Sequence, residues 1–110
     1  MINLHGELNA KSRKKRYIKY QRGITFAYRL FGGETSGDIA RDESISTTRV
    51  FQVFYVTMRF IWGDKKWRER WPHGCHDLAG MRKNVKAIYP LLNEARWYCR
   101  QRIISLGNLS

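Results

Sequence analysis

The sequence predicts an all-α protein, with a three-helix domain followed by a C-terminal helical extension. Apolar residues recur at intervals of three and four over much of the chain, which is the period of a helix. Hydroxyl, carboxylate and glycine residues stand where helices begin and end. The run richest in β-branched and aromatic residues, residues 49–62, does not alternate with period two through residues 53–56. A strand there, leading into a turn at Gly63, is therefore the weaker alternative.

The first element combines a basic run with an apolar face. Residues 11–22, KSRKKRYIKYQR, hold seven Lys or Arg and no acid. We expect residues 1–16 to form a basic arm, with Ser12 able to cap a helix inside the run. An inward helix face is predicted from spacings of four, three and three. Gly32 and Gly33 then end the helix. The inward residues are Tyr20, Ile24, Ala27 and Leu30.

A short second helix is predicted after this break. Thr35 followed by Asp38 is a capping-box pattern, and Ala40 is small enough for another helix to cross closely. Residues 44–46 form the turn, and Ser46 caps the third helix. Residues 17–62 thus have the organisation of a helix-turn-helix domain. The N-terminal part of its recognition helix faces base edges in the major groove. The predicted base contacts are Thr47, Thr48, Arg49 and Gln52.

One pattern resembles a known family. Ser46-x-x-Arg49-Val50-x-Gln52-Val53, followed by Met58-Arg59-x-Ile61, is similar to the C-terminal half of sigma-70 region 4 and to phage late-gene regulators with region-4-like domains. The resemblance covers residues 35–61. It implies a helix-turn-helix that reads the minus-35 promoter element and contacts RNA polymerase.

The sequence departs from that pattern in three ways. Glu43 replaces an apolar residue under the turn, and Ser44 stands where glycine is preferred, because the backbone there needs positive φ. The family mostly has charged residues at the positions of Phe51, Phe54, Tyr55, Val56 and Phe60. These residues need a cover, so the domain is not expected to stand alone.

Charge points to a polyanionic partner. The chain has 21 Lys and Arg against 9 Asp and Glu, a formal net charge of +12, and an isoelectric point near 10.2. A solvated helix face is the plain alternative for the basic run. Beside a helix-turn-helix, phosphate contact is favoured. The predicted phosphate contacts are Lys14, Lys15, Arg16, Lys19, Arg22 and Ser46.

Two readings stay open for the aromatic and polar residues at 62–77. A lid over the aromatic flank, or stacking on unpaired bases, would suit Trp62, Trp67 and Trp71, and the lid is favoured.

A zinc site is suggested by His73, Cys75 and His76, with distant Cys99. All but Cys99 crowd one loop without a second ligand pair, so we expect no metal and no cofactor.

The extension, residues 63–110, carries a helical seam. Apolar residues alternate spacings of three and four, and Pro90 is expected to kink the element or to open a second helix. The seam serves either packing on residues 50–62, which is favoured, or a homodimer that reads two half-sites. Its residues are Leu78, Met81, Val85, Ile88, Leu92, Ala95 and Cys99.

These observations favour a sequence-specific transcription regulator that binds double-stranded DNA. The alternatives are a structural RNA-binding or ribosome-associated protein, and a polymerase-binding inhibitor whose surface includes Asp38, Asp42 and Glu43. No nucleophile with a nearby base and no phosphate-binding glycine loop suggests an enzyme. No apolar run reaches the length of a membrane span, so a cytoplasmic, nucleoid-associated protein is expected.

Overall fold

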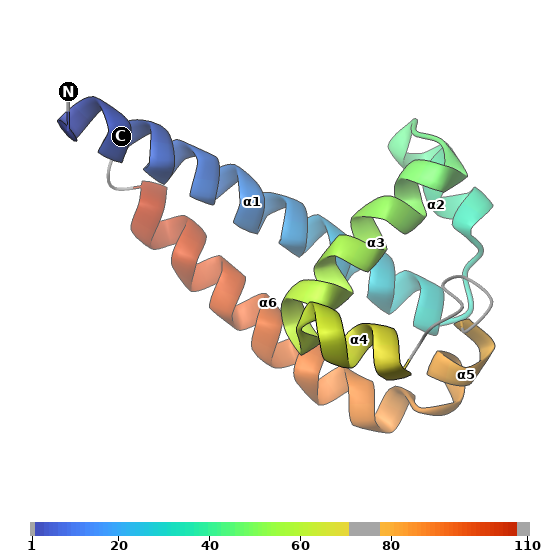
Figure 1. The fold of residues 1–110 in the computed structure, drawn as a ribbon. Helices are drawn as coiled ribbons and strands as arrows, with labels where there is room; N and C mark the ends of the chain where they lie inside the picture. Colours follow the sequence, from blue (N-terminus) through green and yellow to red (C-terminus); the bar gives the residue numbers. More distant parts are fainter. Residues whose placement is uncertain (1, 71–77, 108–110) are drawn as a thin grey trace.

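Two long antiparallel helices, α1 and α6, lie side by side along the molecule in the computed structural model (Figure 1). The structure describes residues 2–70 and 78–107, and the residues in these ranges form no strand. The predicted all-α class is therefore confirmed. The N-terminal end of α1 and the C-terminal end of α6 lie together, whereas α2 and the start of α3 project near the other end (Figure 1). The helices are α1 (Ile2–Phe31), α2 (Ser36–Glu43), α3 (Thr47–Trp62), α4 (Asp64–Arg70), α5 (Leu78–Lys83) and α6 (Val85–Gly107).

α1 begins much earlier than expected. Its 30 residues start at Ile2, so the separate basic arm predicted for residues 1–16 is wrong for all its described residues. α6 lies beside the C-terminal part of this stretch, where Lys14 Nζ is close to Gly107 at the end of α6. Tyr17 makes edge contacts with Tyr98, at 6.0 Å between ring centroids, and lies under the Arg102 guanidinium. A helix of this length spans about 45 Å, close to the 48 Å longest dimension of the molecule.

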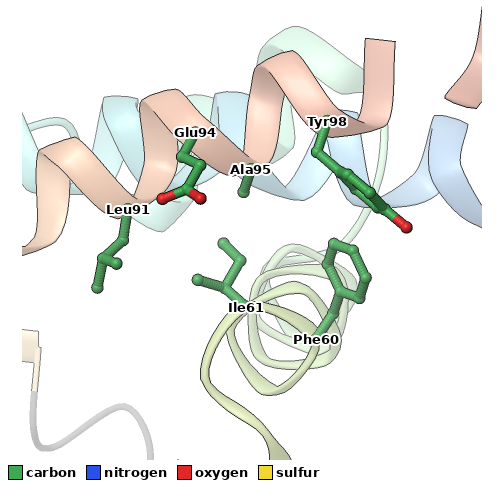
Figure 2. Close-up of a pocket in the computed structure, with 6 residues that line it drawn as sticks. All are labelled: Phe60, Ile61, Leu91, Glu94, Ala95 and Tyr98. Atoms are coloured by element: carbon green, nitrogen blue, oxygen red, sulfur yellow. The ribbon is translucent and has the colours of Figure 1, made fainter. Parts of the chain in front are cut away.

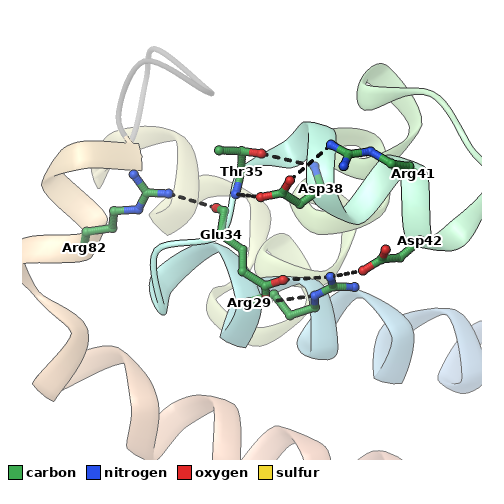
Figure 3. A network of polar contacts seen from close by, with 7 residues as sticks. All are labelled: Arg29, Glu34, Thr35, Asp38, Arg41, Asp42 and Arg82. Atoms are coloured by element: carbon green, nitrogen blue, oxygen red, sulfur yellow. Dashed lines mark hydrogen bonds and ion pairs between the residues drawn. The ribbon is translucent and has the colours of Figure 1, made fainter.

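α1 ends at the predicted glycine pair. The N–H of Gly32 donates to the Tyr28 carbonyl at 2.9 Å, and Gly33 has a φ of 105°, a conformation that glycine adopts without strain. A side chain of α5, Arg82, caps this end of α1. Arg82 donates from Nε to the Leu30 carbonyl at 2.9 Å. Its Nη2 donates to the Glu34 carbonyl at 3.1 Å (Figure 3). A cation at the C-terminal end of a helix is favourable, because the last carbonyls lack helical partners.

The caps of α2 follow the sequence prediction. Thr35 Oγ1 accepts from the Asp38 N–H at 3.1 Å, and the Asp38 carboxylate accepts from the Thr35 N–H at 3.3 Å (Figure 3). These two bonds form the predicted capping box. Ser44 ends the helix with a φ of 56° and a ψ of 43°, the left-handed conformation inferred for that position. The inward residues Ile39 and Ala40 are buried, as expected.

α3 is a helix over the whole stretch for which a strand was the alternative. It crosses α1 closely at Gly23. A Cβ built on Gly23 would lie 1.8 Å from Thr57 Oγ1 and 2.9 Å from the Val53 carbonyl oxygen. Only glycine permits this approach. The Thr57 hydroxyl is buried and donates to the Val53 carbonyl at 2.8 Å, so this buried hydroxyl group has a hydrogen-bond partner.

Part of the aromatic flank of α3 is covered by α1 and α6. Phe54, which is 1% exposed, packs edge-on against Phe31 of α1. Phe60 stacks on Tyr20 at 4.1 Å between ring centroids and also contacts Tyr98 of α6. Of the three tryptophans expected to form a lid, Trp62 packs at the core edge, and the side chain of Trp67 and the whole of Trp71 lie outside the described part.

A small hollow of about 220 Å³ remains where the end of α3 meets α6 (Figure 2). Its lining is apolar or aromatic apart from Glu94. The hollow marks a place where α6 meets the C-terminal end of α3. The lining residues are Phe60, Ile61, Leu91, Glu94, Ala95 and Tyr98.

The seam residues pack within the chain. Those from α5 and α6 join one core with residues of α1, α2 and α3. Because they are covered by their own chain, the homodimer built on this seam is not available. The buried members are Met81, Ile88, Leu92, Ala95 and Cys99, and Leu78 and Val85 pack at the core edge.

The break in the extension lies at Asn84, not at Pro90. The Asn84 carbonyl accepts from the N–H groups of Ala87 and Ile88, and its Nδ2 donates to the Gly80 carbonyl at 2.8 Å. Pro90 lies inside α6 at an exposed position, so the prediction that it opens a second helix is wrong. Among the described helices, none is both long and apolar enough to cross a bilayer.

Candidate nucleic-acid interface

The first turn and a half of α3 presents polar side chains to solvent. Ser46 is the N-cap, and its Oγ accepts from the Arg49 N–H at 3.1 Å. This hydrogen bond fixes where the helix begins, because the cap residue is extended and the next residues are helical. The apolar side of the same turns, Val50 and Val53, is fully buried. The exposed residues are the four predicted base contacts, Thr47, Thr48, Arg49 and Gln52.

The basic residues of α1 do not all lie on one side. Lys15 and Arg16 are exposed, and Lys19 is half-buried. Lys14 turns toward the C-terminal end of α6, where its Nζ lies 3.5 Å from a Cβ built on Gly107. That position favours a charge at the end of a helix over a phosphate contact shared with the others.

Arg22 connects the basic stripe on α1 to the turn between α2 and α3. Its guanidinium lies 3.2 Å from the Glu43 carboxylate and 5.4 Å from the centroid of the Phe26 ring. Glu43, the residue that departs from the family pattern under the turn, is therefore half-buried as the partner of an arginine. Because both side chains keep more than a third of their surface exposed, the pair contributes little to stability, about 0–1 kcal/mol. Its effect is to position Arg22 beside the turn.

The acidic residues near α2 are held by arginines (Figure 3). Arg29 donates to Glu34 from Nε at 2.9 Å and from Nη2 at 2.7 Å, and Nη2 also donates to Asp42. The hydrogen bonds from Arg29 hold the pKa of Glu34 below its usual range. The pKa of Asp38 is lowered by the hydrogen bonds from Thr35, and Arg41 pairs with Asp38 at 3.2 Å. The carboxylates on this side of the turn are therefore paired with the positive charges of neighbouring arginines.

Comparison with protein-family models, with curated proteins and with solved structures finds no match for the chain. The resemblance to sigma-70 region 4 thus rests on the short pattern in residues 35–61 alone.

Sequence reasoning missed a second basic site. Arg96 and Arg100 of α6 line a groove with residues of α1 on a side of α1 that α3 does not cover. The available signal is the alternation of basic and aromatic residues in EARWYCRQR, residues 94–102, of which only Ala95 and Cys99 belong to the predicted seam. The seam occupies one face of α6, and Arg96 and Arg100 occupy others.

The zinc hypothesis involves residues 73–77, which lie outside the described ranges. Cys99, its distant ligand, is fully buried in the core, where burial raises the pKa of the thiol to about 11. Within residues 2–70 and 78–107, no three His, Cys, Asp or Glu side chains group in a way that could hold a metal ion.

Proposed function

We propose that this protein is a sequence-specific DNA-binding transcription regulator that reads duplex DNA with α3. The observation that carries the proposal is the arrangement at the start of this helix. Ser46 caps α3, Val50 and Val53 are buried on one side of the helix, and a polar stripe is left facing solvent. A capped helix N-terminus with such a stripe fits the major groove as the recognition helix of a helix-turn-helix.

The side chains on this stripe suit base recognition. Arg49 and Gln52 are three residues apart, so they lie on neighbouring positions of one helix face. Arginine donates two hydrogen bonds to guanine, glutamine forms a bidentate pair with adenine, and a threonine methyl packs on the thymine methyl. Each good bidentate pair discriminates against the wrong base by about 1–3 kcal/mol.

The basic residues of α1 would supply affinity without sequence preference. Lys15, Arg16 and Lys19 carry charge along the helix that supports α3, and the Arg22–Glu43 pair fixes the end of that stripe beside the turn. Phosphate contacts of this kind position a protein on a duplex. Ser46 and the first N–H groups of α3 form a further anion-favouring point.

The rival functions find less support. A polymerase-binding inhibitor would present Asp38, Asp42 and Glu43, but each of these carboxylates is paired with an arginine. A structural RNA-binding protein needs no polar reading stripe on a capped helix. The net charge alone fits both RNA and DNA, and the stripe on α3 is the observation that favours DNA.

Selection of duplexes from a random pool, followed by titration at several salt concentrations, tests the proposal. Arg49→Ala should flatten the sequence preference at one base position and lower affinity for the selected duplex by about tenfold or more. Lys15→Ala should weaken all duplexes alike and reduce the salt slope by about one. Lys83→Ala, a change of equal charge at an exposed position on α5, is the control and should leave both properties unchanged.

Two results would refute this function. One is the absence of any preferred duplex sequence in the wild-type protein. The other is tighter binding to a structured RNA than to every duplex, with Arg49→Ala having no effect on either.

A further inference from the structure

A basic groove runs between α1 and α6, apart from the reading stripe of α3. It has a volume of about 360 Å³ and contains three arginines and no acidic lining residue. From α6 it takes Arg96 and Arg100, which are one helical turn apart. The α1 residues that line it are Ile18, Gln21, Arg22 and Thr25.

The groove and α3 use different sides of α1. α3 crosses α1 at Gly23, whereas Ile18 and Thr25 belong to the groove. With 100° between successive residues, Ile18 points about 140° away from Gly23 around the helix axis. A ligand in the groove therefore does not compete for the stripe that carries Arg49 and Gln52.

The two α6 arginines are placed for phosphates. The Arg96 guanidinium lies over the Tyr28 ring, 5.1 Å from its centroid, and the Tyr28 hydroxyl donates to Asn93 Oδ1. These contacts hold Arg96 at the rim before any ligand binds. Arg96 and Arg100 are separated by about 6 Å along the helix, which is close to the interval between successive phosphates on a strand. Neither forms an ion pair with another described residue.

Large apolar side chains stand exposed around these arginines. Trp97 is 63% exposed, Ile104 is 56% exposed, and Ile18, at the groove itself, is 48% exposed. On the surface of α6, Trp97 neighbours Arg100 at a spacing of three, and Ile104 follows Arg100 at a spacing of four. An exposed tryptophan beside a pair of arginines offers a stacking surface next to two cationic donors.

We infer that this groove binds single-stranded nucleic acid. Arg96 and Arg100 bind adjacent phosphates of the strand, and an unpaired base stacks on Trp97. Positively charged grooves with aromatic stacking positions are the general way in which proteins hold single strands, because every base has an apolar face. A duplex lacks free base faces and would leave Trp97 unused. The inference does not depend on the reading role of α3.

Fluorescence anisotropy with labelled oligo(dT) and oligo(U) of equal length, added to the full chain, tests this inference. Arg96→Gln with Arg100→Gln should weaken binding at least tenfold and lower the salt slope by about 1.4, since each single-strand phosphate contact contributes about 0.7. Trp97→Ala should weaken binding by about fivefold to a hundredfold at an unchanged salt slope, because it removes stacking and no charge. The ratio of the affinities for oligo(dT) and oligo(U) identifies DNA or RNA as the preferred ligand.

Lys65→Gln with Lys66→Gln, on exposed positions of α4, is the charge-matched control and should retain most of the affinity. Thermal unfolding of each variant separates lost binding from lost structure, and Trp97→Ala keeps the test valid if the arginine variant fails to fold. The inference is overturned if Trp97→Ala binds the strands as well as the wild type, or if the control loses as much affinity as the arginine variant. Binding to anionic vesicles that exceeds strand binding and depends on Trp97 would also overturn it. If Arg49→Ala abolishes duplex preference while strand binding persists, the two sites are independent.

Discussion

Gly23 and Thr57 meet at the crossing of α1 and α3, where a Cβ on Gly23 would lie 1.8 Å from the threonine hydroxyl oxygen and 2.6 Å from its Cβ. The Val53 carbonyl, on the same side, is part of the α3 backbone and cannot move as a side chain can. The distance between α1 and α3 at this crossing is therefore set by the absence of a side chain at Gly23.

Gly23→Ala is expected to destabilise the protein by about 1–3 kcal/mol, because the helices must separate to admit the methyl group. Urea denaturation measures the loss. Gly37→Ala in α2 is the matched control, since its added Cβ makes only an ordinary contact, 3.7 Å from Thr35 Oγ1. That control should be neutral or stabilise by up to about 1 kcal/mol. Equal effects of the two changes would contradict the close crossing.

Ser44→Gly should stabilise the protein. Ser44 has a φ of 56°, in the left-handed region where a side chain costs about 1–2 kcal/mol, and glycine relieves this strain while losing some chain entropy. We expect a net gain of about 0.5–1 kcal/mol in the free energy of unfolding. Ser105→Gly, in the right-handed α6, should instead lower stability by about 0.5 kcal/mol. A loss of stability in Ser44→Gly would argue against the conformation of this turn.

Stability should decline in acid through the contacts of Glu34. Hydrogen bonds from Arg29 lower the pKa of Glu34 in the folded state. The contribution of this carboxylate is therefore complete above the ordinary glutamate pKa, about 4.3, and is lost as the pH falls through the lower, folded value. Denaturation curves measured from about pH 7 to about pH 3 should show a smaller pH dependence in Glu34→Gln. Glu94→Gln, which removes no ion pair between described residues, should not reduce it.

The Cys99 thiol should be inert in the folded protein. The thiol is 0% exposed, so a reagent in solution cannot reach it. Burial also raises the pKa of the thiol to about 11, so the reactive thiolate is scarce near neutral pH. In a Cys75→Ser background, a thiol reagent at about pH 8 should label Cys99 only at the rate of unfolding. Denaturant should accelerate labelling to that of a free cysteine. Rapid labelling of the native protein would mean that α6 separates from α1.

The parts of the fold that depend on neighbouring residues were predictable from sequence. Capping of α2 by Thr35 and Asp38, the left-handed Ser44 and the cap at Ser46 each involve atoms within a few residues, so short patterns encode them. The exposure of Arg49 and Gln52 followed from the same periodicity that buried Val50 and Val53.

The contacts between distant segments were not predictable. The pairing of α1 with α6 joins segments far apart in the chain, and local composition gives no sign of such a partner. The aromatic flank of α3 visibly needed a cover, but its partners Phe31, Tyr20 and Tyr98 come from two different helices. The groove lined by Arg96 and Arg100 exists only because α1 lies alongside, so neither helix encodes it alone.

The pairing of α1 with α6 also governs the order in which the molecule can form. During synthesis α1 leaves the ribosome first, and its partner follows only after α2, α3, α4 and α5 have been made. Until then α1 and α3 can meet at Gly23, but Tyr17 lacks the ring contact with Tyr98 that α6 brings. Contacts between such distant segments slow folding, because the long intervening chain must close into a loop before they can form. The contacts between α1 and α6 are therefore among the last that the described helices can make during synthesis.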